Sequence, residues 1–241
     1  MQIRLEQIKH TYRSQQLDAR TVLAIDEWTV PTGQQLLLRG ISGSGKTTLM
    51  NIIAGLLPPT SGQVWLDDQA IYQLREAQRD RFRAQYIGYV FQIHLLVPTL
   101  SALENVELPL VFAQKLAGVQ RRARATAILN QVGLGDHLRH RPVQMSAGQR
   151  LRVAVARALV NRPCILLADE PTAALDPANA AAVMDLLQQL CRQQNATLFV
   201  ASHDPTLAQR FDSVVDLERG HLETHNHHAL SAPEAAPCAT T

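Results

Sequence analysis

The residues best suited to chemistry lie in one glycine-rich segment, GISGSGKTT, from Gly40 to Thr48. Two glycines separated by four residues and followed by Lys and Thr form the pattern of a phosphate-binding loop. Gly43 and Gly45 would let successive backbone N–H groups point at phosphate oxygens, at the positive end of the helix that follows. The alternative is an ordinary glycine-rich turn.

Lys46 and Thr47 supply the charge and the hydroxyl that such a loop needs. Lys46 would place a point charge between the outer phosphates of a nucleotide, and the Thr47 hydroxyl would ligate Mg²⁺. Lysine is scarce in this chain, at three residues against twenty arginines, which argues against an accidental lysine here. The predicted phosphate-contacting residues are Gly40, Ser42, Gly43, Ser44, Gly45, Lys46, Thr47 and Thr48.

A second candidate segment, CILLADE (Cys164–Glu170), is an apolar run that ends in two carboxylates. Asp169, at the end of a buried strand, would hold Mg²⁺ through water, and Glu170 would polarise an attacking water as a general base. An apolar strand that ends in two acids is also common as plain structure. Combined with a phosphate loop, the two acids favour the hydrolytic interpretation.

The chain around these motifs predicts an α/β fold. Residues 1–90 are expected to be mainly strands, and a Leu-rich strand leads into the phosphate loop. Strand, helix and strand follow one another after Ile165 with a crossover length that joins parallel strands, which predicts a parallel core. The predicted elements that border the candidate residues are the strands Gln35–Arg39, Tyr86–Phe91, Ile165–Ala168 and Thr197–Ala201 and the helices Leu49–Leu57, Ala125–Val132, Leu151–Val160 and Ala178–Arg192.

Composition and charge exclude several classes of protein. With 46% hydrophobic and 18% charged residues, the chain can bury a sizeable core, which excludes intrinsic disorder and a collagen-like repeat. The net charge of +2 gives no support for a nucleic-acid partner, so none is expected. The longest apolar runs are too short for a membrane span. The first residues lack the apolar region of a signal peptide. Three scattered cysteines fit a reducing compartment.

The chain divides into one large domain and a short tail. We expect a domain over residues 1–220, with a core from 1–92 and 151–220 and a helical lobe from about 93–150. Residues 221–241 hold four of the nine histidines and neither Lys nor Arg. This segment is expected to be a disordered tail, with metal binding by its histidines as the alternative.

The segment MSAGQRLRVAVARAL (Met145–Leu159) resembles the signature of ABC transporter ATPases, and the resemblance extends over about residues 1–220. It implies a RecA-like P-loop NTPase core with an N-terminal antiparallel β lobe and an inserted α-helical lobe. The other segments with a counterpart in that family are Tyr12 (the aromatic that stacks on adenine), Gln92 in YVFQ (the Q-loop), Ala174–Asp176 (the D-loop) and His203 in LFVASHD (the switch histidine).

The resemblance also implies a mechanism, in which a homodimer binds and hydrolyses ATP with Mg²⁺. One copy would supply the phosphate loop and the acidic strand, and the second copy would supply the signature segment across the ATP. The residues that the resemblance assigns are catalytic Lys46, Gln92, Glu170 and His203, metal-binding Thr47, Gln92 and Asp169, and nucleotide-binding Tyr12, Ser146, Gly148 and Gln149 in addition to the loop.

The signature segment departs from the family at Ala147, where a second glycine is usual. If a helix starts here, residue 147 has a negative φ, which alanine adopts without strain. The methyl group would lie close to the γ-phosphate, so we expect a slower turnover and the same function.

The segment Ile93–Gln114 follows the Q-loop, where family members contact a membrane permease. With LREAQRDRFRAQYIGYVFQ before it, this segment resembles the ATPases of lipoprotein release and macrolide export, which are thought to drive motion in a membrane partner. An integral membrane permease subunit is therefore the expected partner, at the cytoplasmic face of the inner membrane.

The alternatives are an importer ATPase of the methionine or amino-acid type and an ATP switch that controls an envelope enzyme. A soluble family member acting on ribosomes or DNA and a phosphate-loop kinase or GTPase fit the sequence less well.

Overall fold

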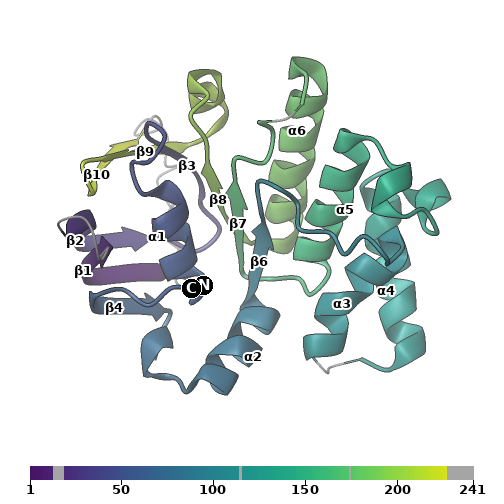
Figure 1. Ribbon diagram of the computed structural model, residues 1–241, viewed down its shortest axis with the longest axis horizontal. Helices are drawn as coiled ribbons and strands as arrows, with labels where there is room; N and C mark the ends of the chain where they lie inside the picture. The colour runs from purple at the N-terminus through teal and green to yellow at the C-terminus, as the bar shows by residue number, and fades with distance from the viewer. Residues whose placement is uncertain (13–18, 114–115, 174, 227–241) are drawn as a thin grey trace, which may run out of the picture.

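The computed structural model describes residues 1–12, 19–113, 116–173 and 175–226, and Figure 1 shows two sheets beside a group of helices. The strands are β1 (Ile3–Tyr12), β2 (Arg20–Val30), β3 (Gln35–Arg39), β4 (Ser61–Leu66), β5 (Gln69–Ala70), β6 (Ile87–Val90), β7 (Ile165–Asp169), β8 (Thr197–Ala201), β9 (Ser213–Glu218) and β10 (His221–Asn226). The helices are α1 (Lys46–Ile53), α2 (Glu76–Tyr86), α3 (Ala102–Ala113), α4 (Gly118–Gln131), α5 (Ala147–Leu159) and α6 (Pro177–Gln194).

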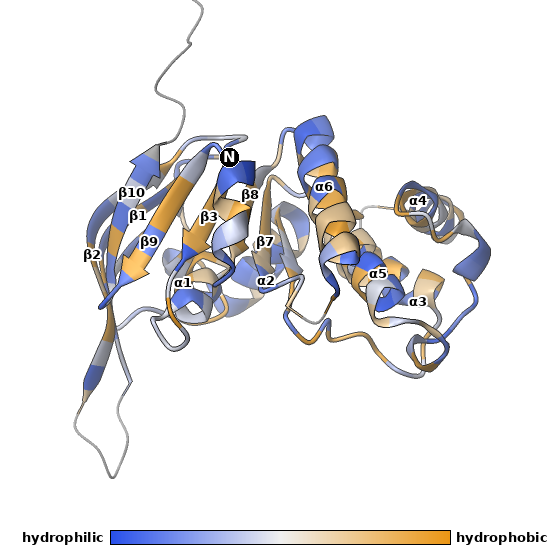
Figure 2. Ribbon diagram, turned by 90° about the horizontal axis from the view of Figure 1, so that it is seen from above, coloured by the Kyte–Doolittle hydropathy of each residue, from blue (hydrophilic) through white to orange (hydrophobic). Residues whose placement is uncertain are grey.

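The larger sheet has the strand order β10-β9-β3-β8-β7-β6, and all its strands except β10 run parallel to one another. Strands β7 and β8 are buried along their whole length, as expected of central strands covered on both faces, and they are drawn mostly in orange in Figure 2. The carboxyl ends of β3, β8, β7 and β6 therefore lie at one edge of the sheet. The segments that follow these four strands meet at that edge.

Each face of the parallel sheet packs against a different core. Leu36 and Leu38 of β3 join a cluster with α1 and with the antiparallel sheet β2-β1-β4-β5. Leu37, between them, joins a second cluster with α3, α5 and α6. This alternation follows from the period of two in a strand, where successive side chains point to opposite faces. The same strand thus carries the phosphate loop and joins the two halves of the fold.

Asn105 in α3 fixes the segment that connects β6 to the helical half. The residue is fully buried, and its Nδ2 donates to the carbonyl oxygens of Val97, Leu100 and Ser101 at 3.2, 3.1 and 3.0 Å. Its Oδ1 accepts a hydrogen bond from the Val97 backbone N–H at 2.8 Å. A buried amide whose groups are all bonded rigidifies its surroundings, so this connection is held against α3.

The predicted α/β architecture is confirmed, and two sequence-based expectations about its elements need correction. Helix α2 falls within residues 1–90, which were expected to be mainly strands. None of its residues is buried, so the apolar repeat that would indicate a helix is missing from this segment. Helix α1 starts at Lys46, three residues before the predicted helix, because the phosphate loop leads directly into it.

Among the helices of the described residues, none combines the length and apolar character needed to cross a membrane.

A further correction concerns the C-terminal segment, where a disordered tail was expected from His221 onward. Residues His221–Asn226 instead form β10, which pairs with β9 in register. The two residues between the strands, Arg219 and Gly220, both have positive φ, as the tight turn of a two-residue hairpin requires. His225 lies 3.1 Å from Asp216 of β9, and the rest of the expected tail, residues 227–241, lies outside the described residues.

Candidate active site

The phosphate loop leaves the carboxyl end of β3 and ends at Lys46, the first residue of α1. Gly43 and Gly45 have φ values of +77° and +110°, which residues with a Cβ rarely adopt. A Cβ at Gly43 would meet no atom within 4 Å, so the loop backbone borders open space there. The free N–H groups of the loop and of the first turn of α1 can therefore be reached by an anion.

Lys46 is only 7% exposed, and its ammonium group turns back onto the loop. Its Nζ donates to the carbonyl oxygens of Gly40 and Ile41 at 2.7 and 3.2 Å and lies 3.9 Å from Glu170 Oε1. A Cβ at Gly40 would lie 2.5 Å from Ser44 Oγ, so the loop packs tightly on itself behind the ammonium group. Oxygen atoms compensate the buried charge, and phosphate oxygens could serve in the same way.

Thr47 and Asp169 meet between α1 and β7. The Thr47 hydroxyl donates to Asp169 Oδ2 at 2.7 Å, and the Asp169 residue is buried. Burial raises the pKa of Asp169 above its ordinary value, and the nearby charge of Glu170 raises it further, while the bond from Thr47 and the charge of Lys46 oppose the rise. The fold thus holds a carboxylate whose charge is incompletely compensated by the protein.

These two side chains fit Mg²⁺ bound together with a nucleotide. In the described part of the chain, no cluster of three or more His, Cys, Asp or Glu side chains could hold a metal by itself. Thr47 and Asp169 offer hydroxyl and carboxylate oxygens, the donors that Mg²⁺ prefers, and Mg²⁺ commonly takes its other ligands from phosphates and water. A cation here would also compensate the buried charge of Asp169.

Glu170 occupies a strained position immediately after β7. Its φ is +45°, which is uncommon for a residue with a Cβ, and its backbone N–H donates to Ala201 O of β8 at 2.9 Å. Its Oε1 lies 2.9 Å from His203 Nδ1, and its Oε2 accepts a hydrogen bond from the Ser202 hydroxyl at 3.3 Å. The turn therefore aims the carboxylate at the segment that follows β8.

Tyr12 reaches the site through an irregularity in β1. The pairing of β1 with β2 shifts between His10 and Thr11, and such a bulge redirects the side chains beyond it. The Tyr12 hydroxyl lies 3.2 Å from Thr48 Oγ1 of α1, and half of the residue is exposed. An exposed ring beside a phosphate loop is suited to stacking on a nucleotide base.

The structure brings most of the predicted site residues around one cavity of about 820 Å³ at the carboxyl edge of the sheet. Four consecutive strands contribute to it: β3 leads to the loop, β8 to His203, β7 to the two acids and β6 to Gln92. The predicted residues that line it are Tyr12, Ser42, Gly43, Gly45, Lys46, Thr47, Thr48, Gln92, Asp169, Glu170 and His203.

The signature residues lie elsewhere in the chain, around a separate hollow of about 360 Å³. Ser146, Gly148 and Gln149 line this hollow with Leu175 and Asp176. Of the expected D-loop, residue 174 lies outside the described residues. The cavity at the phosphate loop and the signature hollow have no lining residue in common.

The signature turn is a reciprocal helix cap. Ser146 Oγ accepts a hydrogen bond from the Gln149 backbone N–H at 3.2 Å, and Gln149 Oε1 accepts one from the Ser146 backbone N–H at 2.9 Å. Because Ser146 Oγ acts as an acceptor in the cap, its own hydrogen can be donated outward. Ala147 is the first residue of α5, and its helical conformation agrees with the predicted negative φ.

Several residues at the site were missed from the sequence. Ser202 donates to Glu170, and Arg20, Val22 and Ile41 line the cavity near Tyr12. Ser202 directly precedes His203 and follows a buried strand, so its position in the sequence could have indicated that it belongs to the site. The positions of Arg20 and Val22 depend on the shifted pairing of β1 with β2, for which the sequence carries no local sign.

Comparisons with known proteins agree with this geometry. A family model described as "ABC transporter" matches residues 23–173. The lipoprotein-releasing system ATP-binding protein LolD of Hydrogenovibrio crunogenus is 41% identical over 215 residues, which are 89% of this chain and 93% of that protein. The macrolide export ATP-binding/permease protein MacB of Syntrophobacter fumaroxidans is also 41% identical, over 98% of this chain and 33% of that protein.

A solved structure shares the whole architecture. The dimeric post-hydrolysis state of the ATP-binding cassette MJ0796, bound to ADP and Pi, superposes with a TM-score of 0.87 at 36% identity. The match covers 95% of this chain and 100% of that one. The predicted core with an antiparallel β lobe and a helical lobe is thereby confirmed.

Removing the charge of Asp169 should stabilise the fold and abolish its chemistry. The raised pKa of Asp169 means that folding disfavours its charged form, so stability is lost as the pH rises from the unfolded pKa through the folded one. Near neutral pH, Asp169→Asn should therefore melt a few degrees above the wild type, while Mg²⁺-dependent ATP hydrolysis falls at least about tenfold.

Calorimetry with EDTA and a phosphate-release assay with Mg²⁺ measure the two effects. Asp26→Asn is the control, since Asp26 is exposed on β2 and lines neither the cavity at the phosphate loop nor the signature hollow. A lower melting temperature for Asp169→Asn than for the wild type would contradict the account of the buried charge.

Proposed function

The chain belongs to the ABC transporter family and hydrolyses ATP with Mg²⁺, and from this premise we propose that two copies close around ATP to drive a membrane permease. The observation that carries the proposal is the division of the site within one chain. The phosphate loop and both acids line one cavity, whereas the signature turn lines another. A second copy would place its signature hollow over the first copy's phosphate loop, which completes two sites at once in a symmetric pair.

Each side chain then has a task that follows from its geometry. The loop N–H groups and Lys46 bind the phosphates, and Thr47 with Asp169 would hold Mg²⁺, which neutralises charge on the phosphate oxygens. Glu170 lies at 3.9 Å from Lys46 and accepts the proton of the attacking water. His203, at 2.9 Å from Glu170, orients this carboxylate and can reach the γ-phosphate side of the cavity.

Gly148 supports the arrival of a ligand from outside the chain. A Cβ at this position would meet no atom within 4 Å, so packing within one copy does not require glycine. Glycine in a helix is also less favourable than alanine. A close approach by the ATP held on the second copy gives a reason for this residue, and Ser146 would donate its free hydroxyl hydrogen to the same ATP.

Glu170→Gln should bind ATP and remain a dimer. The amide cannot take a proton from water, so turnover should fall at least about a hundredfold, and the ATP that joins the two copies would persist. Light scattering should give the mass of a dimer with ATP and Mg²⁺ and of a monomer without nucleotide. Adding Ser146→Arg, which obstructs the signature turn, should restore the monomer in ATP. Full hydrolysis by Glu170→Gln would refute the role of Glu170 as the base.

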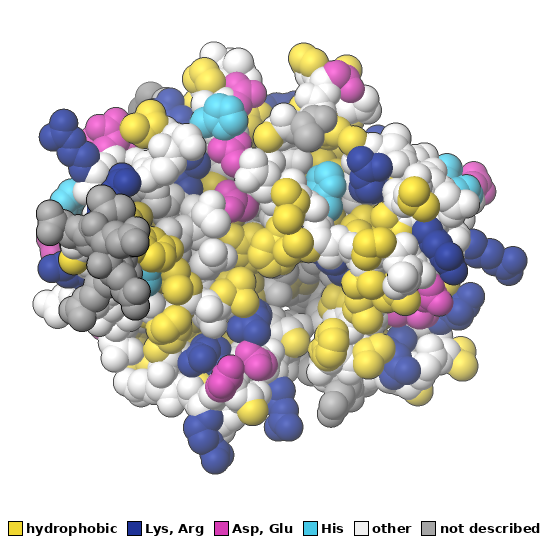
Figure 3. Space-filling model, in the orientation of Figure 1, with side chains coloured by type: hydrophobic (Ala, Val, Ile, Leu, Met, Phe, Trp, Pro, Cys, Tyr) yellow, Lys and Arg dark blue, Asp and Glu magenta, His cyan; other side chains and the backbone are white. Residues whose placement is uncertain are grey.

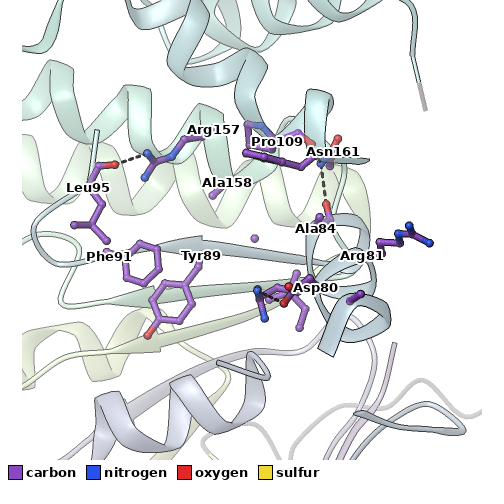
Figure 4. A pocket seen from close by; sticks show the side chains of 15 residues that line it. Asp80, Arg81, Ala84, Tyr89, Phe91, Leu95, Pro109, Arg157, Ala158 and Asn161 are labelled. Atoms are coloured by element: carbon purple, nitrogen blue, oxygen red, sulfur yellow. Dashed lines mark hydrogen bonds and ion pairs between the residues drawn. The ribbon is translucent and has the colours of Figure 1, made fainter. Parts of the chain in front are cut away.

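The permease would dock in a groove of about 670 Å³ between α2, β6, α3 and α5. Figure 3 shows this face hollowed between the two halves, with apolar side chains around the hollow. Phe91, Leu95 and Phe112 contribute apolar surface to the groove, and Asp80 and Arg81 of α2 carry charge at its side, as Figure 4 shows in part. Phe112 is 68% exposed, which is unusual for a large aromatic side chain without a partner.

One arginine links this groove to the signature helix. Arg157 of α5 donates to the carbonyl oxygens of His94 and Leu95, both at 2.6 Å. His94 and Leu95 have positive φ and follow Gln92, which reaches the nucleotide cavity. A change at the γ-phosphate could thus be passed through Gln92 to Leu95, which lines the groove. A movement of α5 could reach Leu95 through Arg157.

The relatives favour a permease of the lipoprotein-release or macrolide-export type. The groove is lined in part by the predicted contact segment Ile93–Gln114. The relatives are named for lipoprotein release and for macrolide export. We place the chain at the cytoplasmic face of the inner membrane, held there by its partner. The importer and the envelope-enzyme switch remain alternatives that the identity of the partner would decide.

Phe112→Glu should prevent capture of the permease. A charge introduced into the apolar groove would remain unpaired when the partner buries it, which weakens binding. The affinity-tagged chain would be incubated with detergent-solubilised membranes of its own organism, and captured proteins identified by mass spectrometry. Val119→Glu on α4 is the matched control, since Val119 is 85% exposed and lies outside the groove. Equal recovery of the same permease by both variants would contradict docking in this groove.

A further inference from the structure

A side-chain contact joins the signature turn to the turn that follows α4. His137 ends a 3₁₀ turn, η2 (Gly135–His137), that follows α4. Its Nε2 lies 3.1 Å from Nε2 of Gln149, in the first turn of α5. The sequence indicated a role for Gln149 and none for His137.

The cap at the signature turn determines which atom donates in this contact. Gln149 Oε1 already accepts the Ser146 backbone N–H at 2.9 Å, so the amide nitrogen Nε2 must face His137. An amide nitrogen is a donor only. Nε2 of His137 must therefore carry a lone pair, which means a neutral ring with its hydrogen on Nδ1.

The turn that holds His137 is itself anchored to α3. The backbone N–H groups of Ala102 and Leu103, at the start of α3, donate to the carbonyl oxygens of His140 and Leu138 at 2.8 and 3.0 Å. The segment from His137 to His140 therefore caps α3, the helix that contributes Phe112 to the permease groove. His137 is thus fixed by one helix and holds the first turn of another.

We infer that His137 is a positioning residue for the signature turn, acting through Gln149. Its lone pair keeps the Gln149 side chain in the cap, and the cap keeps the Ser146 hydroxyl and the backbone at Gly148 in place for ATP on the second copy. His137 does not line the signature hollow and acts only through the amide. The inference rests on the proposed dimer, because a signature turn has no ligand within one chain.

Two substitutions separate the lone pair of His137 from the bulk of its ring. His137→Phe keeps a planar ring and removes the acceptor, whereas His137→Gln can place an oxygen acceptor near the position of Nε2. In the Glu170→Gln background, the dissociation constant of the dimer in ATP and Mg²⁺ would be measured by analytical ultracentrifugation. ATP binding to the monomer would be measured with a fluorescent ATP analogue in the Ser146→Arg variant.

The phenylalanine variant should weaken the dimer about tenfold, because the signature turn is then less well ordered at each of two sites, and the glutamine variant should recover most of the loss. Binding of the ATP analogue to the monomer should be unchanged, because the phosphate loop is untouched. His140→Phe is the matched control: its ring lies 4.9 Å from that of His137, and it should dimerise like the parent.

The other possible outcomes would contradict either the inference about His137 or the proposed dimer. Equal dimerisation of the parent and His137→Phe would overturn the inference, as would equal losses in the phenylalanine and glutamine variants. A parent that stays monomeric in ATP would instead refute the proposed dimer. Nitrogen-15 NMR of the folded wild type at about pH 8 tests the inference without a variant at the contact. The His137 signal, identified by its loss in His137→Gln, should show a hydrogen on Nδ1, and a hydrogen on Nε2 would overturn the inference.

Discussion

The structure depends on one buried ammonium group and the oxygens gathered around it. Lys46 is almost fully enclosed, between two carbonyl oxygens of its own loop and the carboxylate of Glu170. A charge in such a place is tolerated only where oxygens are held close to it, and the parallel order of β3, β8 and β7 holds them there. The buried apolar strands thus hold the charged groups in place, and these groups make the cavity suited to binding phosphate.

Three local features of the fold are unfavourable for the isolated chain and have a role in the proposed assembly. Glu170 has a positive φ, Asp169 is buried with an incompletely compensated charge, and Gly148 stands in a helix where alanine would fit within one copy. Each feature destabilises the isolated chain. A bound metal would offset the buried charge of Asp169, and ATP on the second copy would approach Gly148 closely, which couples metal binding and pairing to the fold.

The motifs could be predicted from the sequence because their spacing is local, whereas several contacts could not. The loop around Lys46 and the acidic end of β7 each lie within one short segment. Helix α2 was missed because it buries no apolar residue, and β10 because its only signal is the Arg219–Gly220 turn. The contact of His137 with Gln149 depends on how two turns pack, which no residue pattern encodes.

The central claim, that one site is built from two chains, is tested most directly by mixing two inactive variants. Lys46→Ala removes the phosphate-loop charge, and Ser146→Arg obstructs the signature turn, so neither should hydrolyse ATP alone. A mixed pair contains one intact site, formed by the loop of the Ser146→Arg chain and the signature turn of the Lys46→Ala chain. The account predicts that mixing restores ATP hydrolysis. An inactive mixture, or full activity of Ser146→Arg by itself, would contradict it.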